Sequence, residues 1–206
     1  QQAAEFDALL MEGTRQTIRD YLLKAFRENR TWDRMFREML VGEPDDAKQQ
    51  GAIRFVSTRV ADPDKLTADT SSLFFGVNVS CAKCHDHPLV SDWKQDHYYG
   101  MYSFFSRSFS AGDFLGEREY GQVNFQTTEG QSRDARLMFL TGDRIDEPAS
   151  QEPDEKAKKA EKAMLEELKK KKEPPPAPSF SRRTALVEAA LADETNDFLP
   201  RAIVNH

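Results

Sequence analysis

Cysteine is scarce in this chain, since Cys81 and Cys84 are the only two among 206 residues. Two cysteines three positions apart are too close to connect distant parts of a fold, which excludes a disulfide framework. We therefore expect both thiols to serve one local purpose.

Long hydrophobic runs and an excess of basic residues are also missing. No run approaches the roughly 18 apolar residues of a membrane-spanning helix, so no transmembrane segment is predicted in this fragment. The 29 Lys and Arg residues are outnumbered by 35 Asp and Glu, which gives a net charge of -6 and argues against nucleic acid as a partner. Because the sequence starts at Gln1 and stops at His206 inside a predicted helix, we interpret it as a fragment or a processed product.

The length allows a real hydrophobic core, and apolar residues recur at helical spacing in several segments. Segment 53–60 is predicted to be extended or irregular. Helices are predicted at 14–29, at 32–41, from Thr67 or Asp69 to about 77, and at 95–109.

Beyond Gly112 the pattern changes, and 122–127 and 136–140 are predicted to form a small hairpin. Segment 154–172 is rich in Ala, Glu and Lys and precedes three prolines, which predicts a solvated helix and a stiff linker. Ser181 is predicted to cap one helix, and another begins near Asp197. The predicted fold class is mainly α, with a small β-hairpin and a charged helical, Pro-rich insert.

Cys81, Cys84 and His85 form a Cys-x-x-Cys-His segment. Two cysteines three residues apart on a helical turn point to the same side, so their sulfurs can add to the two vinyl groups of a haem. His85 is then close enough to be the proximal ligand of the iron. We therefore expect one covalent haem c, and a function as an electron carrier or as the electron-transfer module of a larger envelope protein.

The sixth ligand of the iron is left open among His97, Met101 and Met138. Asp86 and His87 are expected to orient ligands or protons through hydrogen bonds. An empty sixth position would allow peroxide chemistry, so whether the protein is an enzyme also stays open. Aromatic residues near the cysteines could surround the macrocycle, although ordinary core packing explains them equally well: Phe74, Phe75, Trp93, Tyr98, Tyr99, Tyr102, Phe104 and Phe105.

Two other uses of the cysteines remain as alternatives. Cys81 and Cys84 could bind zinc together with two of His85, His87 and His97, in a structural or interaction module. A thioredoxin-like redox pair is disfavoured because no βαβ pattern surrounds the motif.

The segment around the cysteines closely resembles the cytochrome-type domain of large secreted proteins of planctomycete bacteria. Its residues 73–88 read Leu-Phe-Phe-Gly-Val-Asn-Val-Ser-Cys-Ala-Lys-Cys-His-Asp-His-Pro, and 93–99 and 104–105 continue the similarity. Segment 182–206 is similar to the opening of the companion domain that follows in those proteins.

The resemblance implies an extracytoplasmic location and a c-type haem at Cys81, Cys84 and His85. It also implies a redox partner, either a separate protein or a domain of the same polypeptide. The domains expected on this basis are a cytochrome-type domain at 1–148, a charged and Pro-rich linker at 149–179, and the start of the companion domain at 180–206.

Overall fold

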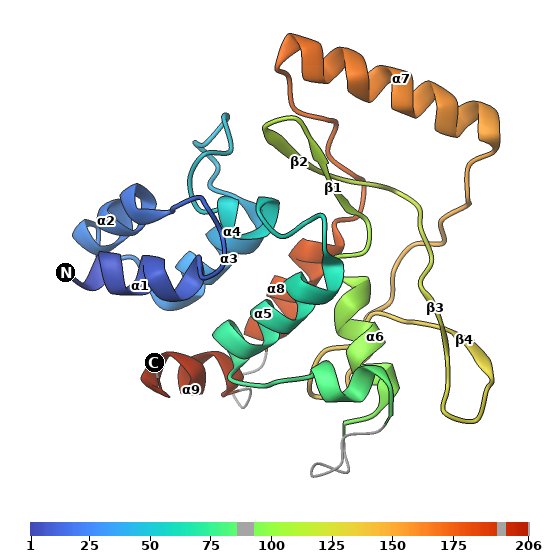
Figure 1. Cartoon of the computed structure of the whole chain (residues 1–206), viewed down its shortest axis with the longest axis horizontal. Helices are drawn as coiled ribbons and strands as arrows, with labels where there is room; N and C mark the ends of the chain where they lie inside the picture. Colours follow the sequence, from blue (N-terminus) through green and yellow to red (C-terminus); the bar gives the residue numbers. More distant parts are fainter. Residues whose placement is uncertain (86–92, 193–196, 206) are drawn as a thin grey trace. The chain divides into compact units, whose positions relative to one another are not determined.

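The computed structural model describes residues 1–85, 93–192 and 197–205. Within these residues the chain is mainly α-helical, with two small antiparallel sheets of two strands each (Figure 1). The predicted fold class is confirmed. No helix in the described part is both long and apolar enough to span a membrane.

The chain divides into two compact units that interleave along the sequence. The first unit comprises Gln1–Ala61, Phe109–Gly116 and Asp154–Ala177, and the second comprises Asp62–Ser108, Glu117–Pro153 and Pro178–His206. The domain bounds expected from the sequence stay a prediction.

The first unit is built from short amphipathic helices. They are α1 (Gln2–Leu10), α2 (Arg19–Arg27), α3 (Trp32–Val41) and α4 (Arg54–Ser57). Helix α1 packs against α2, and α3 packs against α4, which buries Leu22, Phe36 and Phe55 completely. Helix α3 has the predicted bounds, whereas segment 53–60, predicted to be extended or irregular, contains the short helix α4.

A buried charge cluster fixes the helices of the first unit. Arg30 Nη1 donates to Glu38 Oε2 at 2.7 Å and to Glu43 Oε1 at 2.9 Å, and Tyr21 donates its hydroxyl proton to Glu38 Oε2 at 2.8 Å. Burial, together with this hydrogen bond to the Glu38 carboxylate, raises the pKa of Tyr21 above its ordinary value. Each buried charge therefore has a partner of opposite sign or a hydrogen bond.

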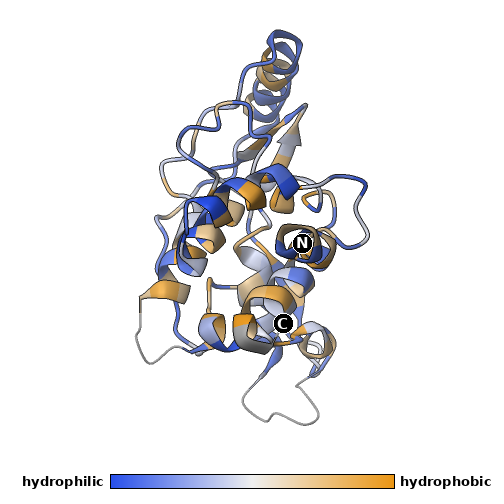
Figure 2. Ribbon diagram, turned by 90° about the vertical axis from the view of Figure 1, so that its left-hand side faces the viewer, coloured by the Kyte–Doolittle hydropathy of each residue, from blue (hydrophilic) through white to orange (hydrophobic). Residues whose placement is uncertain are grey.

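Helix α7 (Glu155–Lys171) is the solvated helix that the charged segment predicted. Asp154 caps it by accepting a hydrogen bond from the Ala157 N–H at 2.7 Å, and none of its residues is buried. Figure 2 shows mainly hydrophilic colours along the charged helix, at the top of the view. The charges of α7 thus need no explanation beyond solvation.

The second unit contains α5 (Pro63–Phe75), the 3₁₀ turn η1 (Ser80–Lys83), α6 (Gln95–Ser103), α8 (Arg182–Leu191) and α9 (Phe198–Asn205). Helix α5 packs against both α6 and α9, and η1 packs against α6 (Figure 1). Helix α5 begins earlier than predicted because Asp62 caps it and Pro63 occupies its first turn. Helix α8 begins as predicted, with Ser181 Oγ accepting from the Thr184 N–H at 3.2 Å.

The strands differ from the prediction in two places. Strand β1 (Ser108–Ala111) pairs with β2 (Phe114–Glu117), so the helix predicted at 95–109 ends at Ser103 instead. Gly112, at φ 68°, supplies the left-handed residue that the tight turn between these strands needs. Strand β3 (Asn124–Gln126) pairs with β4 (Ser132–Asp134), and the predicted strand at 136–140 is only a bridge between Met138 and Arg144.

The guanidinium of Arg182 is almost completely buried in the second unit, with 1% of its side chain exposed. It binds both carboxylate oxygens of Glu147, at 2.9 and 2.6 Å. It also donates to the Ser103 carbonyl and to Ser106 Oγ, each at 3.0 Å. This one side chain therefore joins the start of α8 to the end of α6 and to the loop that carries Glu147.

Asp64 and Lys83 join η1 to α5. Lys83 Nζ lies 2.9 Å from Asp64 Oδ1, and the Tyr98 hydroxyl of α6 donates to the same oxygen. Burial alone would raise the pKa of the Asp64 carboxyl, but the hydrogen bonds from Tyr98 and Lys83 outweigh it and hold the pKa below its ordinary value. The turn is therefore tied to both neighbouring helices.

We expect Arg182→Met to lower the free energy of unfolding by about 3 kcal/mol, because it leaves the Glu147 carboxylate without its main partner. Arg107, whose Nη1 is 3.4 Å from Glu147, limits the loss. Arg136→Met is the matched control, since Arg136 is exposed in the same unit and its loss should cost less than about 0.5 kcal/mol. Equal urea midpoints for the two variants would contradict the role given to Arg182.

Asp64→Asn should reduce the loss of stability that occurs as the pH falls into the acidic range. Because the folded state lowers the pKa of Asp64, its contribution is complete above the ordinary value of 3.8 and is lost as the pH falls through the folded value. The pair is partly exposed, so we expect a contribution of about 1 kcal/mol or less. Thermal melts between neutral and acidic pH measure this effect, and Glu129→Gln, in an exposed turn, serves as the control. An unchanged acid slope for Asp64→Asn would refute it.

Candidate functional site

Cys81 lies on the surface turn η1, and Cys84 directly follows its last residue. Both thiols are free and exposed, and His85 directly after them is exposed as well. Between them, Ala82 is fully buried, and Val79 just before the turn is fully buried too. The turn therefore faces the core with its small apolar residues and faces solvent with its sulfurs.

A buried glutamine holds this turn from behind. Gln95 Nε2 donates to the Lys83 carbonyl at 3.2 Å and to the Gln126 carbonyl at 3.3 Å, while Gln95 Oε1 accepts from the Thr128 N–H at 3.1 Å. Gln95 is 7% exposed, so these bonds are largely protected from water. The amide thus connects η1, the first turn of α6 and strand β3.

The three candidate ligands for a sixth iron position are engaged in packing or in helix capping. Met101 is fully buried on α6. Met138 packs close to Gly100, since a Cβ added at Gly100 would lie 2.6 Å from the Cβ of Met138. His97 Nδ1 accepts a hydrogen bond from the Lys94 N–H at 3.2 Å, which caps α6. Each side chain therefore has a structural role in this fold.

The nearby aromatic rings pack against one another. Tyr99 stacks on Phe125 with centroids 4.3 Å apart, and the Phe75 and Phe139 rings meet edge to face at 5.2 Å. Such contacts are those of an ordinary core. Core packing therefore accounts for these four rings.

The predicted haem and the predicted zinc site are corrected by the structure. Across residues 1–85, 93–192 and 197–205, no group of three or more His, Cys, Asp and Glu side chains could hold a metal ion. Covalent haem c, its electron-carrier function and the zinc alternative were therefore wrong predictions. The motif suggested them, and the resemblance also implied the haem, but the fold exposes Cys81, Cys84 and His85 to solvent and gathers no metal-binding group around them from the described residues.

The absence of a metal-binding group in the part of the chain that the structure describes does not test whether the individual residues of the motif are functional. Cys81, Cys84 and His85 remain a predicted functional group, without the metal assigned to them. Asp86 and His87 lie outside the described residues.

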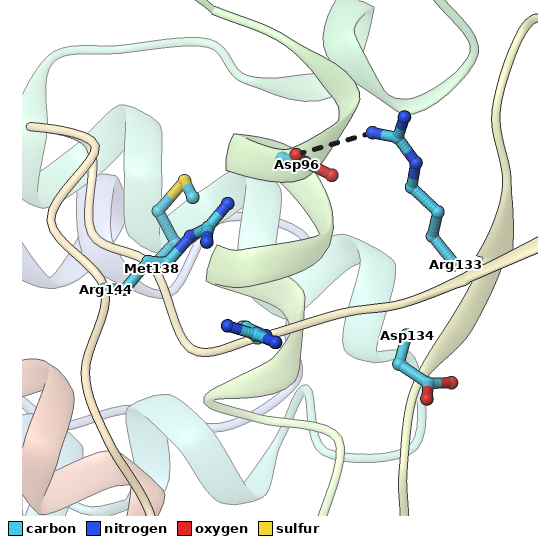
Figure 3. Close-up of a pocket in the computed structure, with 6 residues that line it drawn as sticks. Asp96, Arg133, Asp134, Met138 and Arg144 are labelled. Atoms are coloured by element: carbon cyan, nitrogen blue, oxygen red, sulfur yellow. Dashed lines mark ion pairs between the residues drawn. The ribbon is translucent and has the colours of Figure 1, made fainter.

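Sequence reasoning missed a pocket of about 310 Å³ beside the first turns of α6. Figure 3 shows five of its lining residues with labels. Three arginines contribute to it, and we call it the arginine pocket: Asp96, Arg133, Asp134, Arg136, Met138 and Arg144 line it.

The acidic groups of the arginine pocket are already engaged. Asp96 Oδ2 is 3.9 Å from Arg133 Nη1, an ion pair drawn as a dashed line in Figure 3. Asp134 Oδ1 accepts a hydrogen bond from Asn124 Nδ2 at 3.0 Å across the β3–β4 ribbon. Neither carboxylate forms an ion pair with Arg136 or Arg144 among the described residues.

Arg136 and Arg144 are brought to one place by the Met138–Arg144 bridge. The bridge folds the chain back on itself, because the Phe139 N–H donates to the Asp143 carbonyl at 3.0 Å and Gly142 allows the turn at φ 89°. The two arginines are eight positions apart, so only this return of the chain explains their meeting. The one available signal in the sequence was a local excess of arginine at 133, 136 and 144.

Comparison with known proteins gives one family match. Residues 3–109 match the family model PSCyt2, described as a protein of unknown function (DUF1549) and found in planctomycete proteins. Searches of curated proteins and of solved structures found no match. The matched segment contains η1 and all of α6, including Asp96, but ends before the arginines of the pocket. Because the match spans more than half of its 206 residues, the chain belongs to the PSCyt2 (DUF1549) family.

Proposed function

We propose that this protein is a binding module for a small anionic ligand, and that the arginine pocket is its site. One observation carries the proposal: Arg136 and Arg144 line the same pocket, and neither guanidinium pairs with a carboxylate of the described residues. Arginine binds carboxylate and phosphate groups through paired N–H donors, which makes such a pair an anion site.

The size of the pocket limits the ligand. A volume of about 310 Å³ is at the lower end of the range for ligand sites, so a molecule of metabolite size fits and a polymer segment does not. Its charges add to a net positive value, since three arginines face two aspartates. A compact molecule with two or more carboxylate or phosphate groups satisfies both conditions.

The side chain of Arg133 is free to change its partner. Its distance of 3.9 Å from Asp96 is too long for a hydrogen bond, and 52% of its side chain is exposed. An ion pair this exposed contributes little to stability. Arg133 can therefore turn from Asp96 to an incoming anion at small cost.

The location and the wider architecture belong to the same proposal. The resemblance to secreted planctomycete proteins supports an extracytoplasmic location, and the similarity of 182–206 to a companion domain supports a further domain of the same polypeptide as partner. In that setting the module would present a bound anion to the rest of a larger envelope protein.

Calorimetric titration tests the proposal. We expect citrate or pyrophosphate to bind at low ionic strength and to bind more weakly as salt is added, whereas glucose should not bind. Comparison of citrate with pyrophosphate decides between carboxylate and phosphate as the preferred group.

Arg136→Gln and Arg144→Gln should each weaken binding of the preferred anion by about tenfold or more, because each removes a charge-assisted hydrogen bond. Arg201→Gln is the control, since Arg201 is exposed on α9, where it pairs with Asp197 at 2.6 Å, and is not a lining residue of the pocket. If both pocket variants bind as the wild type does, or if neither anion binds at millimolar concentration, the proposal fails.

Gly100→Ala should disturb the arginine pocket from the side of α6. The new Cβ would lie 2.6 Å from Met138 Cβ and 3.1 Å from the Arg136 carbonyl oxygen, and neither atom is the end of a flexible side chain. Alanine improves helix propensity by about 1 kcal/mol, but we expect overpacking of about 1–3 kcal/mol to exceed that gain. A lower melting temperature together with weaker anion binding is the expected result. A higher melting temperature would contradict the close packing of Gly100 against the Arg136–Met138 segment.

A further inference from the structure

The geometry of η1 places the two thiols of Cys81 and Cys84 on one face. Cys84 directly follows the last residue of η1 with right-handed helical backbone angles (φ -101°, ψ -27°), and in a 3₁₀ turn the side chains at positions i and i+3 lie above one another. The rise of about 2.0 Å per residue separates their Cα atoms by about 6 Å. That separation falls within the range that a disulfide bridges without movement of the backbone.

The turn is fixed while its sulfurs remain accessible. Gln95 holds its backbone at the Lys83 carbonyl, and Asp64 holds the Lys83 ammonium at 2.9 Å. Both thiols are free and exposed to a reagent or a partner. A rigid, accessible pair at bonding separation is suited to reversible disulfide formation.

The Lys83 ammonium adds a favourable charge beside Cys84. The interaction with Asp64 is the main cause that raises the pKa of Lys83, and attraction to Cys84 acts in the same direction. A positive charge beside a sulfur attracts negatively charged disulfides, such as oxidised glutathione, to that sulfur. Cys84 is therefore the better placed of the two to react first.

We propose that Cys81 and Cys84 form a dithiol that exchanges with disulfides of a partner protein, with Cys84 as the attacking thiol. The described strands form no βαβ unit, so the pair acts outside a thioredoxin-like fold. This inference is independent of the arginine pocket and uses none of its residues.

The exchange balances without any further reactant. The Cys84 thiolate attacks one sulfur of the partner disulfide, forms a mixed disulfide and releases the other sulfur, which takes up a proton. Cys81 then loses its proton and attacks Cys84 Sγ, which closes the Cys81–Cys84 disulfide and frees the second partner thiol. Two electrons pass from the cysteine pair to the partner, and the same steps run in reverse when the partner is the dithiol.

Oxidised glutathione and mass spectrometry of the intact chain test the proposal. The fully reduced wild type should alkylate at both thiols, and after oxidised glutathione it should lose the mass of two hydrogen atoms and become resistant to alkylation. Cys81→Ser should instead keep one stable glutathione adduct, because the resolving thiol is missing. Cys84→Ser should react several-fold more slowly than Cys81→Ser.

Lys83→Gln tests whether the charge of Lys83, and not only the exposure of Cys84, determines how fast Cys84 reacts. It should slow the reaction of Cys81→Ser with glutathione several-fold, whereas Lys65→Gln, which removes an exposed lysine of α5, should leave the rate unchanged. A wild type that carries two separate glutathione adducts, or whose reduced thiols resist alkylation, overturns the proposal. So does equal reactivity of Cys81→Ser and Cys84→Ser.

Discussion

The bidentate bond between Arg182 and Glu147 is the interaction on which the second unit depends. Arg182 comes at the start of α8, far along the chain from Ser103 at the end of α6 and Ser106 just after it, which it contacts at the Ser103 carbonyl and at Ser106 Oγ. A guanidinium that is almost completely buried is stable only when its donors are satisfied, and here the main chain, a hydroxyl and a carboxylate share that task. Glu117 extends the arrangement, because it accepts from the Arg182 N–H at 2.7 Å and from Ser181 Oγ at 2.7 Å.

Helix α6, whose end is anchored by Arg182, contacts both candidate sites. Its first residue, Gln95, holds the cysteine turn, and Tyr98 hydrogen-bonds the carboxylate that pairs with Lys83. Gly100 on the same helix lets the Met138 segment approach closely, and that segment contributes to the arginine pocket. A shift of α6 would therefore move the thiols and the pocket together. The two sites are chemically independent, but they share one rigid support.

The cysteine segment shows how a short motif and its surroundings can disagree. The spacing of Cys81 and Cys84 is equally compatible with two thioether bonds, a metal site and a disulfide, because all three need only sulfurs on the same side of a turn. What separates these uses is the environment of the sulfurs. Here the thiols are exposed and the nearby aromatic rings are packed on one another, so the local pattern was a poor guide to the cofactor.

The sequence by itself determined the class of the fold and the local elements whose signals are local. The apolar spacing of α3, the capping residue Ser181 and the charge of α7 all predicted what the structure contains. Tertiary structure alone decided where β1 and β2 pair, which ligands gather around a side chain, and that Arg136 and Arg144 line one pocket. The physical reason is that periodicity and capping act over a few residues. Burial and side-chain pairing depend instead on chain segments that meet only after folding, and no local pattern encodes that meeting.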